Sequence, residues 1–277
     1  MISSSAIVTQ GHIPDFDPQG ALHSQDKLSA FELSLWHLRL NNPHAYIILT
    51  GHGTRPENSK LCDWVYWEDR CRPLDGGGLV IGMPAQYEFV DIGIRHAISK
   101  GFKYCLKLRT DSLWGIPYFE DYCAEILRKE KRQILLSQQT CHGSMRIGDC
   151  IMYGESQLLH KIWNKDNPVI VHEGLQNTAH HFAKALSWDR QESWESFLRK
   201  HIAFRDTISL EWADLRWMWH QLMREIGLEQ LTAQINDNSF DFHKYQWGLQ
   251  WHKIEENGVM SHRYLHDLIS EKEWYGH

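Results

Sequence analysis

Strand-like and helix-like segments alternate along the first part of this chain, and this alternation limits the folds that it can adopt. Short apolar runs bounded by glycine or acidic residues are typical of strands, and longer amphipathic segments are typical of helices. The expected strands are residues 45–50, 64–67, 102–111, 134–137 and 150–153, and the expected helices are 29–40, 85–100, 117–130 and 155–163. This succession predicts an α/β fold in which helices flank a mixed, mostly parallel, Rossmann-like sheet.

The pattern divides the chain into three parts. Residues 1–43 are expected to form an N-terminal arm and a helix, and residues 44–168 an α/β core that binds the ligand. Residues 169–277 are expected to be mainly helical and to pack on that core. Tryptophans are concentrated there; those near residues 212–219 share helical spacing with apolar neighbours, which favours core packing.

Composition excludes several classes of protein. The 277 residues are 42% hydrophobic, which is enough for a large core. A net charge of -6 without an uninterrupted basic block argues against a nucleic-acid binder. No apolar run approaches the roughly 20 residues of a membrane span, and no signal peptide is recognised. The six cysteines form no C-x-x-C pair, so reduced thiols and a cytoplasmic location are expected. Peripheral association with the inner face of the membrane stays open.

One strand ends at a residue suited to ligand binding. The apolar run 102–108 is followed by Asp111, whose carboxylate is expected at the carboxyl end of the strand. Ligands of open α/β sheets bind at that edge. Carboxylate oxygen there suits Mg²⁺ or Mn²⁺ held against nucleotide phosphates. The alternative is that Asp111 caps the following turn or helix.

Familiar catalytic motifs are missing. Neither glycine cluster, 51–53 or 76–78, is followed by the Lys-Ser/Thr of a Walker kinase, and Pro56 stands where the third glycine of a dinucleotide site would be. The sequence contains no G-x-S-x-G elbow and no H-E-x-x-H motif. Acidic strand ends without a nucleophile motif fit the transfer of a group from a nucleotide-linked donor.

Two motifs carry a resemblance to a known family. Lys107-Leu-Arg-Thr-Asp111 and Ile147-Gly-Asp-Cys-Ile-Met-Tyr-Gly154 resemble the WavE-like glycosyltransferases of lipopolysaccharide synthesis, which are of the GT-A type. The resemblance covers about residues 44–165. It implies a GT-A-like fold, a nucleotide-sugar donor, a glycan or polysaccharide acceptor, and Mn²⁺ or Mg²⁺. The chain departs from the usual GT-A pattern at one position. GT-A enzymes commonly have an Asp-x-Asp motif, and Arg109 stands where the first aspartate of that motif would be.

The resemblance also implies roles for individual residues. Asp111 would hold the metal and the donor diphosphate, with His252 as a C-terminal metal ligand. The negative charge that develops on the departing nucleoside diphosphate would be offset by the metal or by an arginine. The donor-binding candidates are Thr50, Gly51, His52, Asp69, Arg95, Lys107, Arg109 and Asp111. The structural alternatives are a simple tight turn at Gly51 and a surface charge on a helix at Arg95.

An inverting transfer also needs a carboxylate to take the proton of the acceptor hydroxyl. Asp149 and Glu173 are the candidates. The structural alternatives are a turn at Asp149 and a helix cap at Glu173. Two other classes of protein remain open: a Rossmann-like methyltransferase, and a non-catalytic carbohydrate-binding protein that would explain the many aromatic residues.

Overall fold

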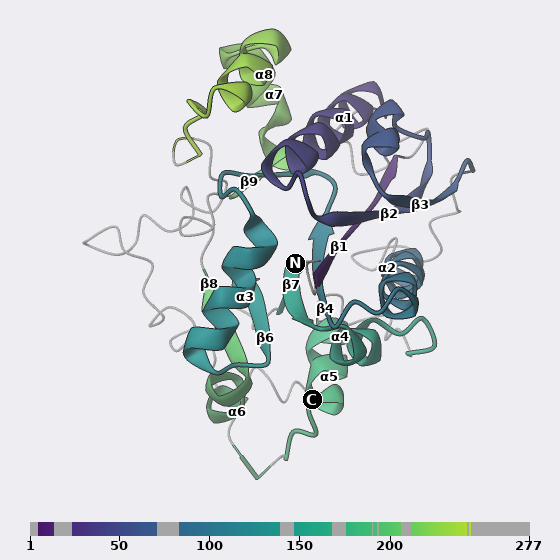
Figure 1. Cartoon of the computed structure of the whole chain (residues 1–277), viewed down its shortest axis with the longest axis vertical. Helices are drawn as coiled ribbons and strands as arrows, with labels where there is room; N and C mark the ends of the chain where they lie inside the picture. Colours follow the sequence, from purple (N-terminus) through teal and green to yellow (C-terminus); the bar gives the residue numbers. More distant parts are fainter. Residues whose placement is uncertain are drawn as a thin grey trace.

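A seven-stranded sheet forms the centre of the computed structural model, which describes residues 5–13, 24–70, 83–138, 147–167, 176–189, 191–192, 194–205, 212–242 and 244 (Figure 1). The strand order is β3-β2-β1-β4-β7-β6-β8. The strands are β1 (Ser5–Ile13), β2 (Tyr46–Gly53), β3 (Trp64–Glu68), β4 (Tyr104–Arg109), β6 (Ile134–Gln138), β7 (Ile147–Glu155) and β8 (Ile202–Arg205). A second sheet pairs β5 (Ser112–Trp114) with β9 (Trp212–Asp214).

The main sheet is mixed. Strands β3, β2, β1 and β4 run parallel to one another, whereas β7 is antiparallel to both β4 and β6. Strand β8 is parallel to β6. The expected fold class, a mostly parallel α/β sheet flanked by helices, is confirmed.

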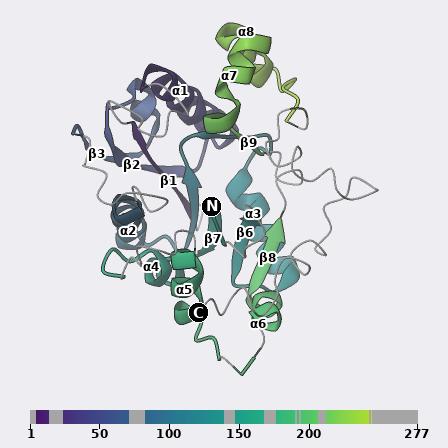
Figure 2. The same ribbon diagram turned by 180° about the vertical axis from the view of Figure 1, so that it is seen from behind.

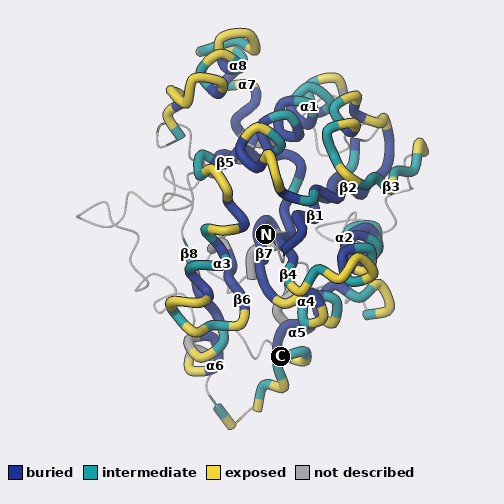
Figure 3. The backbone as a smooth tube through the Cα atoms, in the orientation of Figure 1, coloured by how far each residue is buried: buried dark blue, intermediate teal, exposed yellow. Residues whose placement is uncertain are grey.

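Helices cover both faces of this sheet (Figures 1 and 2). Apolar residues of α1 (Ser24–Asn41) and α3 (Phe119–Glu130) pack on one face. The other face is covered by α2 (Met83–Ser99), α4 (Ser156–Trp163), α5 (Gln176–Ala185) and α6 (Trp194–His201). The described central strands between these layers are largely buried, whereas the edge strand β3 is partly exposed (Figure 3).

The strand at the centre of the sheet was not predicted. Ser5–Ile13, within the segment expected to be an N-terminal arm, forms β1 between β2 and β4. Its local composition is only partly apolar, yet Thr9 and Gln10 are 1% and 7% exposed because helices cover both faces of the strand. Burial between neighbours overrides the weak local signal.

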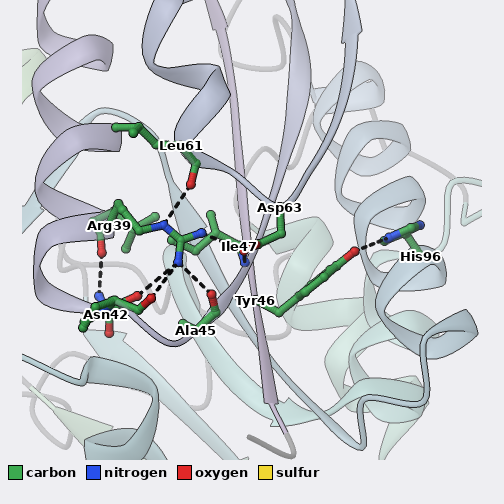
Figure 4. Close-up of polar contacts among 10 residues, drawn as sticks. Arg39, Asn42, Ala45, Tyr46, Ile47, Leu61, Asp63 and His96 are labelled. Atoms are coloured by element: carbon green, nitrogen blue, oxygen red, sulfur yellow. Dashed lines mark hydrogen bonds and ion pairs between the residues drawn. The ribbon is translucent and has the colours of Figure 1, made fainter. Parts of the chain in front are cut away.

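The end of α1 is fixed to the sheet by Arg39 (Figure 4). Its Nε donates to the carbonyl of Leu61 at 2.8 Å, its Nη1 to the carbonyl of Ala45 at 3.0 Å, and its Nη2 to Asp63 at 2.6 Å. Asp63 also accepts the backbone N–H of Ile47, a residue of β2, at 2.8 Å. The short 3₁₀ helix η1 (Glu57–Leu61) is thereby joined to both elements.

The C-terminal part contains short strands as well as helices. Helices α7 (Leu215–Glu225) and α8 (Leu228–Asn236) pack against the outer side of α1. Trp219 is 2% exposed in this cluster, which confirms the expected core packing at this tryptophan. Within the described ranges, no helix is both long and apolar enough to cross a membrane.

Candidate functional site

The strand order reverses between β1 and β4. The chain passes from β1 through β2 to β3 on one side of β1, and β4 then lies on its other side. The crevice at the carboxyl ends of the strands at such a reversal is where open α/β sheets bind ligands. Both α1, which follows β1, and α2, which precedes β4, have their N-terminal ends toward this edge. Their helix dipoles favour negative charge there.

Ionisable side chains form a row across the carboxyl ends of four parallel strands. His52 pairs in register with His12 of β1 on one side and with Glu68 of β3 on the other. The pairing of β1 with β4 ends at Gln10 and Arg109, and two residues further along these strands lie His12 and Asp111. Asp111 therefore lies at the end of the fourth strand, as the sequence predicts.

His12 and His52 stack on each other beneath this edge. Their ring centroids are 5.4 Å apart, and the ring of Phe89 from α2 stacks on the other side of His52 at 5.3 Å. Lys27, in the first turn of α1 and 4% exposed, has its Nζ 3.3 Å from Nε2 of His12. This geometry suits an ammonium donor and a neutral imidazole acceptor.

The surroundings of His12 keep it neutral. Burial is the largest cause that lowers its pKa well below the ordinary value, and Lys27, His52 and Arg109 act in the same direction. Among the described residues, Asp111 acts in the opposite direction and raises the pKa. Lys27, Arg109 and Asp111 thus bring charged side chains close to a neutral imidazole at this part of the edge.

Arg109 and Asp111 form a two-point ion pair. Nε of Arg109 donates to Oδ1 of Asp111 at 2.9 Å, and Nη2 donates to Oδ2 at 2.6 Å. The Asp111 side chain is 6% exposed, whereas that of Arg109 is 22% exposed. The carboxylate is therefore more deeply buried than the guanidinium.

The described side chains around Asp111 do not form a set of ligands for a divalent cation. Both carboxylate oxygens already accept hydrogen bonds from a guanidinium, and a metal bound beside it would meet like charge. Among the described residues, no group of three or more His, Cys, Asp or Glu side chains is arranged to hold a metal ion. His252, the expected second ligand, lies outside the described residues.

The expected donor-binding residues of β2 are close to the row but buried. Thr50 is 0% and His52 3% exposed. A Cβ built at Gly51 would lie 2.1 Å from the carbonyl oxygen of Gly11 and 2.4 Å from the ring of Trp67, so the glycine allows close packing at this position. The indole N–H of Trp67 donates to the carbonyl of Gly53 at 2.8 Å, which holds the ring there.

Other expected donor-binding residues lie apart from the row. Lys107 is fully buried in β4, with its ammonium 4.7 Å from the centre of the Trp163 ring. Arg95 pairs with Asp91 on α2 at 2.7 Å, and its neighbour His96 contacts Tyr46 at the opposite, amino end of β2. Asp69 is exposed directly after β3.

One of the two candidate bases is placed by the backbone. Strand β7 is antiparallel to β4, so its first residues, which include Asp149, lie at the edge where β4 ends. The last described pair of the two strands is Leu108 with Ile151. Glu173 lies outside the described residues.

The small sheet connects the C-terminal part to the same edge. Ser112, directly after Asp111, pairs with Asp214 of β9. The N–H of Leu215, the first residue of α7, donates to the carbonyl of Asp111 at 2.9 Å. Asp111 therefore takes part in two structures, through its side chain in the ion pair and through its backbone at the start of α7.

Sequence reasoning missed His12 and Lys27. Both depend on β1, because His12 lies at its carboxyl end and Lys27 in the helix that follows it. The available signal was the pair of Gly-His motifs, Gly11-His12 and Gly51-His52, which occupy equivalent positions on adjacent strands.

No protein-family model and no curated protein matches the chain, so the resemblance to the WavE-like family has no support at that level. Solved structures with a similar arrangement include a nucleotide-diphospho-sugar transferase from Desulfovibrio desulfuricans, at 10% identity and a TM-score of 0.45 over 88% of this chain and 99% of that one. A glucose-1-phosphate thymidylyltransferase from Bacillus anthracis has 10% identity and a TM-score of 0.47 over 86% and 99%.

A third similar structure is a 4-diphosphocytidyl-2C-methyl-D-erythritol synthase from Anaerococcus prevotii, with 10% identity and a TM-score of 0.42 over 74% of this chain and 90% of that one. All three TM-scores lie below 0.5. The likeness concerns the course of the chain, and neither a ligand nor a residue role follows from it.

Proposed function

We propose that this protein is a glycosyltransferase that moves a sugar from a nucleotide-sugar donor to a glycan acceptor. The observation that supports it is the convergence of Lys27, His12, Arg109 and Asp111 at the carboxyl edge where the strand order reverses. Basic side chains at an edge of this kind suit a nucleoside diphosphate, whose negative charge grows as the glycosidic bond breaks.

The reaction needs an acceptor hydroxyl and a base besides the donor site. The bond between the anomeric carbon and the diphosphate oxygen breaks, and the acceptor hydroxyl oxygen forms the new bond to that carbon. The hydroxyl proton passes to a carboxylate base, for which Asp149 remains the candidate near this edge and Glu173 the alternative. The acceptor would approach from the side where β9 ends and α7 begins, next to Asp111.

Donor binding tests this function. Calorimetric titration with UDP-, GDP- and CMP-sugars, each with Mn²⁺ and with EDTA, is expected to find one nucleotide series that binds. The same series should then release its nucleoside diphosphate when glycan acceptors are added. Binding of S-adenosylmethionine without any nucleotide sugar would indicate a methyltransferase instead. Binding of glycans alone would indicate a carbohydrate-binding protein.

A variant pair makes the location of the site testable. Lys27→Met removes one cation at the reversal point, and we expect weaker binding of the nucleotide. Lys100→Met removes an exposed cation just after α2, and it serves as the control with the same change in net charge. Equal affinities of the two variants would place the nucleotide elsewhere.

A further inference from the structure

We propose that the protein has a second binding site at the opposite edge of the sheet, for a small organic anion that combines one acidic group with a ring. The site is a hollow of about 430 Å³ between α3, the adjoining ends of β4 and β7, and the first turn of α4. Hollows of this size hold small-molecule ligands. The proposal does not depend on the proposed function, because it concerns other residues.

The hollow is separated from the candidate functional site by the length of β4. This strand begins with Tyr104, which lines the hollow, and ends with Arg109 at the carboxyl edge. At about 3.3 Å per residue, the two ends are about 17 Å apart. Strand β7 is antiparallel to β4, so Glu155 at its end pairs with Tyr104 and lies at the hollow too. A small molecule bound here does not reach the reaction at the other edge.

The floor of the hollow is apolar and aromatic. The rings of Tyr104 and Tyr153 stack with their centroids 5.9 Å apart and their planes 12° from parallel. Tyr153 is 1% exposed, and its hydroxyl lies 3.0 Å from Oγ of Ser5, a hydrogen bond that fixes the ring. Leu127 of α3 and Leu158 of α4 complete this floor. Such a surface favours a ligand that brings a ring out of water.

A guanidinium lies beside the apolar floor. Arg132 lines the hollow and is half-buried, and in the part of the chain that the structure describes its side chain forms no hydrogen bond or ion pair. The neighbouring Arg128 differs, because Glu125 accepts two hydrogen bonds from it at 2.9 and 2.8 Å. Glu155 has its own counter-charge in Lys103, at 3.8 Å. The charge of Arg132 is therefore available to a carboxylate or a phosphate.

Two kinds of molecule share this chemistry, and separate probes distinguish them. AMP joins a ring to a phosphate, and indole-3-acetate joins a ring to a carboxylate. Inorganic phosphate and adenosine each present one half of the AMP molecule. In calorimetric titrations of the full chain, we expect AMP or indole-3-acetate to bind more tightly than either half. The probe that binds better identifies the acidic group.

Four variants locate the binding. Arg132→Met should weaken it about tenfold, because charge-assisted hydrogen bonds are lost. Ala124→Leu places a larger side chain in the hollow and should also weaken binding. Lys131→Met, at an exposed cation next to Arg132 that does not line the hollow, is the charge-matched control. Lys27→Met, at the other edge of the sheet, should leave the affinity unchanged. Circular dichroism and unfolding midpoints establish that each variant is folded.

Three results would overturn the proposal. The first is that neither AMP nor indole-3-acetate binds. The second is that folded Arg132→Met and Ala124→Leu bind the probe as the wild type does, or that Lys27→Met abolishes binding and so assigns the probe to the carboxyl edge. The third is that inorganic phosphate binds as tightly as AMP while indole-3-acetate does not bind, because the ring would then contribute nothing. The donor titrations described above are unaffected by any of these results.

Discussion

Arg39 and Asp63 are joined at 2.6 Å between Nη2 and Oδ2, and they connect the last turn of α1 to the residue that precedes β3. The same carboxylate oxygen accepts the N–H of Ile47 in β2. Arg39 also donates to the backbone carbonyls of Leu61 and Ala45, so its side chain supplies hydrogen bonds to several chain segments at once. The contact links a helix, a loop and two strands.

Replacing this arginine should therefore destabilise the fold. Arg39→Met is expected to lower the free energy of unfolding by about 2 kcal/mol, since carbonyls and a carboxylate lose their donor. Arg39→Lys should not restore it, because an ammonium cannot reproduce the fork. Urea unfolding of the variants measures the loss. Arg128→Met, at an exposed ion pair, is the control and should leave stability nearly unchanged. Similar losses for both variants would contradict the assigned role.

The buried His37 should make stability depend on pH. Its burial lowers the pKa from 6.5 to about 4, and its Nε2 lies 2.8 Å from the amide nitrogen of Asn41. The folded-state pKa is below the unfolded one, so the neutral ring contributes fully above pH 6.5. This contribution is lost as the pH falls toward 4, by about 3 kcal/mol in all.

The variant His37→Phe isolates this contribution. Unfolding midpoints between pH 7 and pH 5 should fall less steeply in the variant than in the wild type, although His12 leaves some dependence in both. An unchanged slope would show that another group dominates.

Gly51 should not tolerate a side chain. The Cβ of Gly51→Ala would lie 2.1 Å from the carbonyl oxygen of Gly11, a backbone atom that can move only if β1 and β2 separate. A cost of about 1–3 kcal/mol is expected from such overpacking, with a lower thermal midpoint as the readout. Gly101→Ala, where nothing lies within 4 Å but φ is 85°, should cost only about 1 kcal/mol.

Thiol reactivity should follow burial. Burial raises the pKa of Cys62 and Cys105 to about 12 and that of Cys123 well above its ordinary value. At pH 8, about one thiol in ten thousand is then ionised at a pKa of 12, and the thiolate is the reactive form. Iodoacetamide should leave these cysteines unmodified in the folded protein and modify them in urea, as peptide mass spectrometry can measure. Rapid labelling of Cys105 before unfolding would contradict this.

Much of the fold follows from local patterns. The segment expected as the helix 85–100 is α2, whose residues Tyr87, Val90, Ile94 and Ala97 are at most 1% exposed, and Gly101 ends it with a φ of 85°. The strand before Asp111 was also predicted correctly, because a continuous apolar run ends there in polar residues. These elements carry their signal in their own residues.

The remainder depends on contacts between distant segments. Strand β1 is recognisable only once β2 and β4 lie beside it, and the short strand β8 pairs with β6 from a stretch expected to be helical. The candidate site shows the same limit. Asp111 was found from its own strand, whereas its pairing with Arg109 depends on side-chain conformation, and His12 and Lys27 depend on β1.

The central place of β1 affects how the protein is made. The ribosome releases β1 first, and its partner β2 follows within about forty residues, but the other partner, Tyr104–Arg109, emerges only after α2. Pairings between such distant segments form slowly, and unpaired apolar strands are prone to aggregate. One side of β1 therefore stays unpaired until β4 has been synthesised. The edge that carries His12 and Asp111 can form only when β4 pairs with β1.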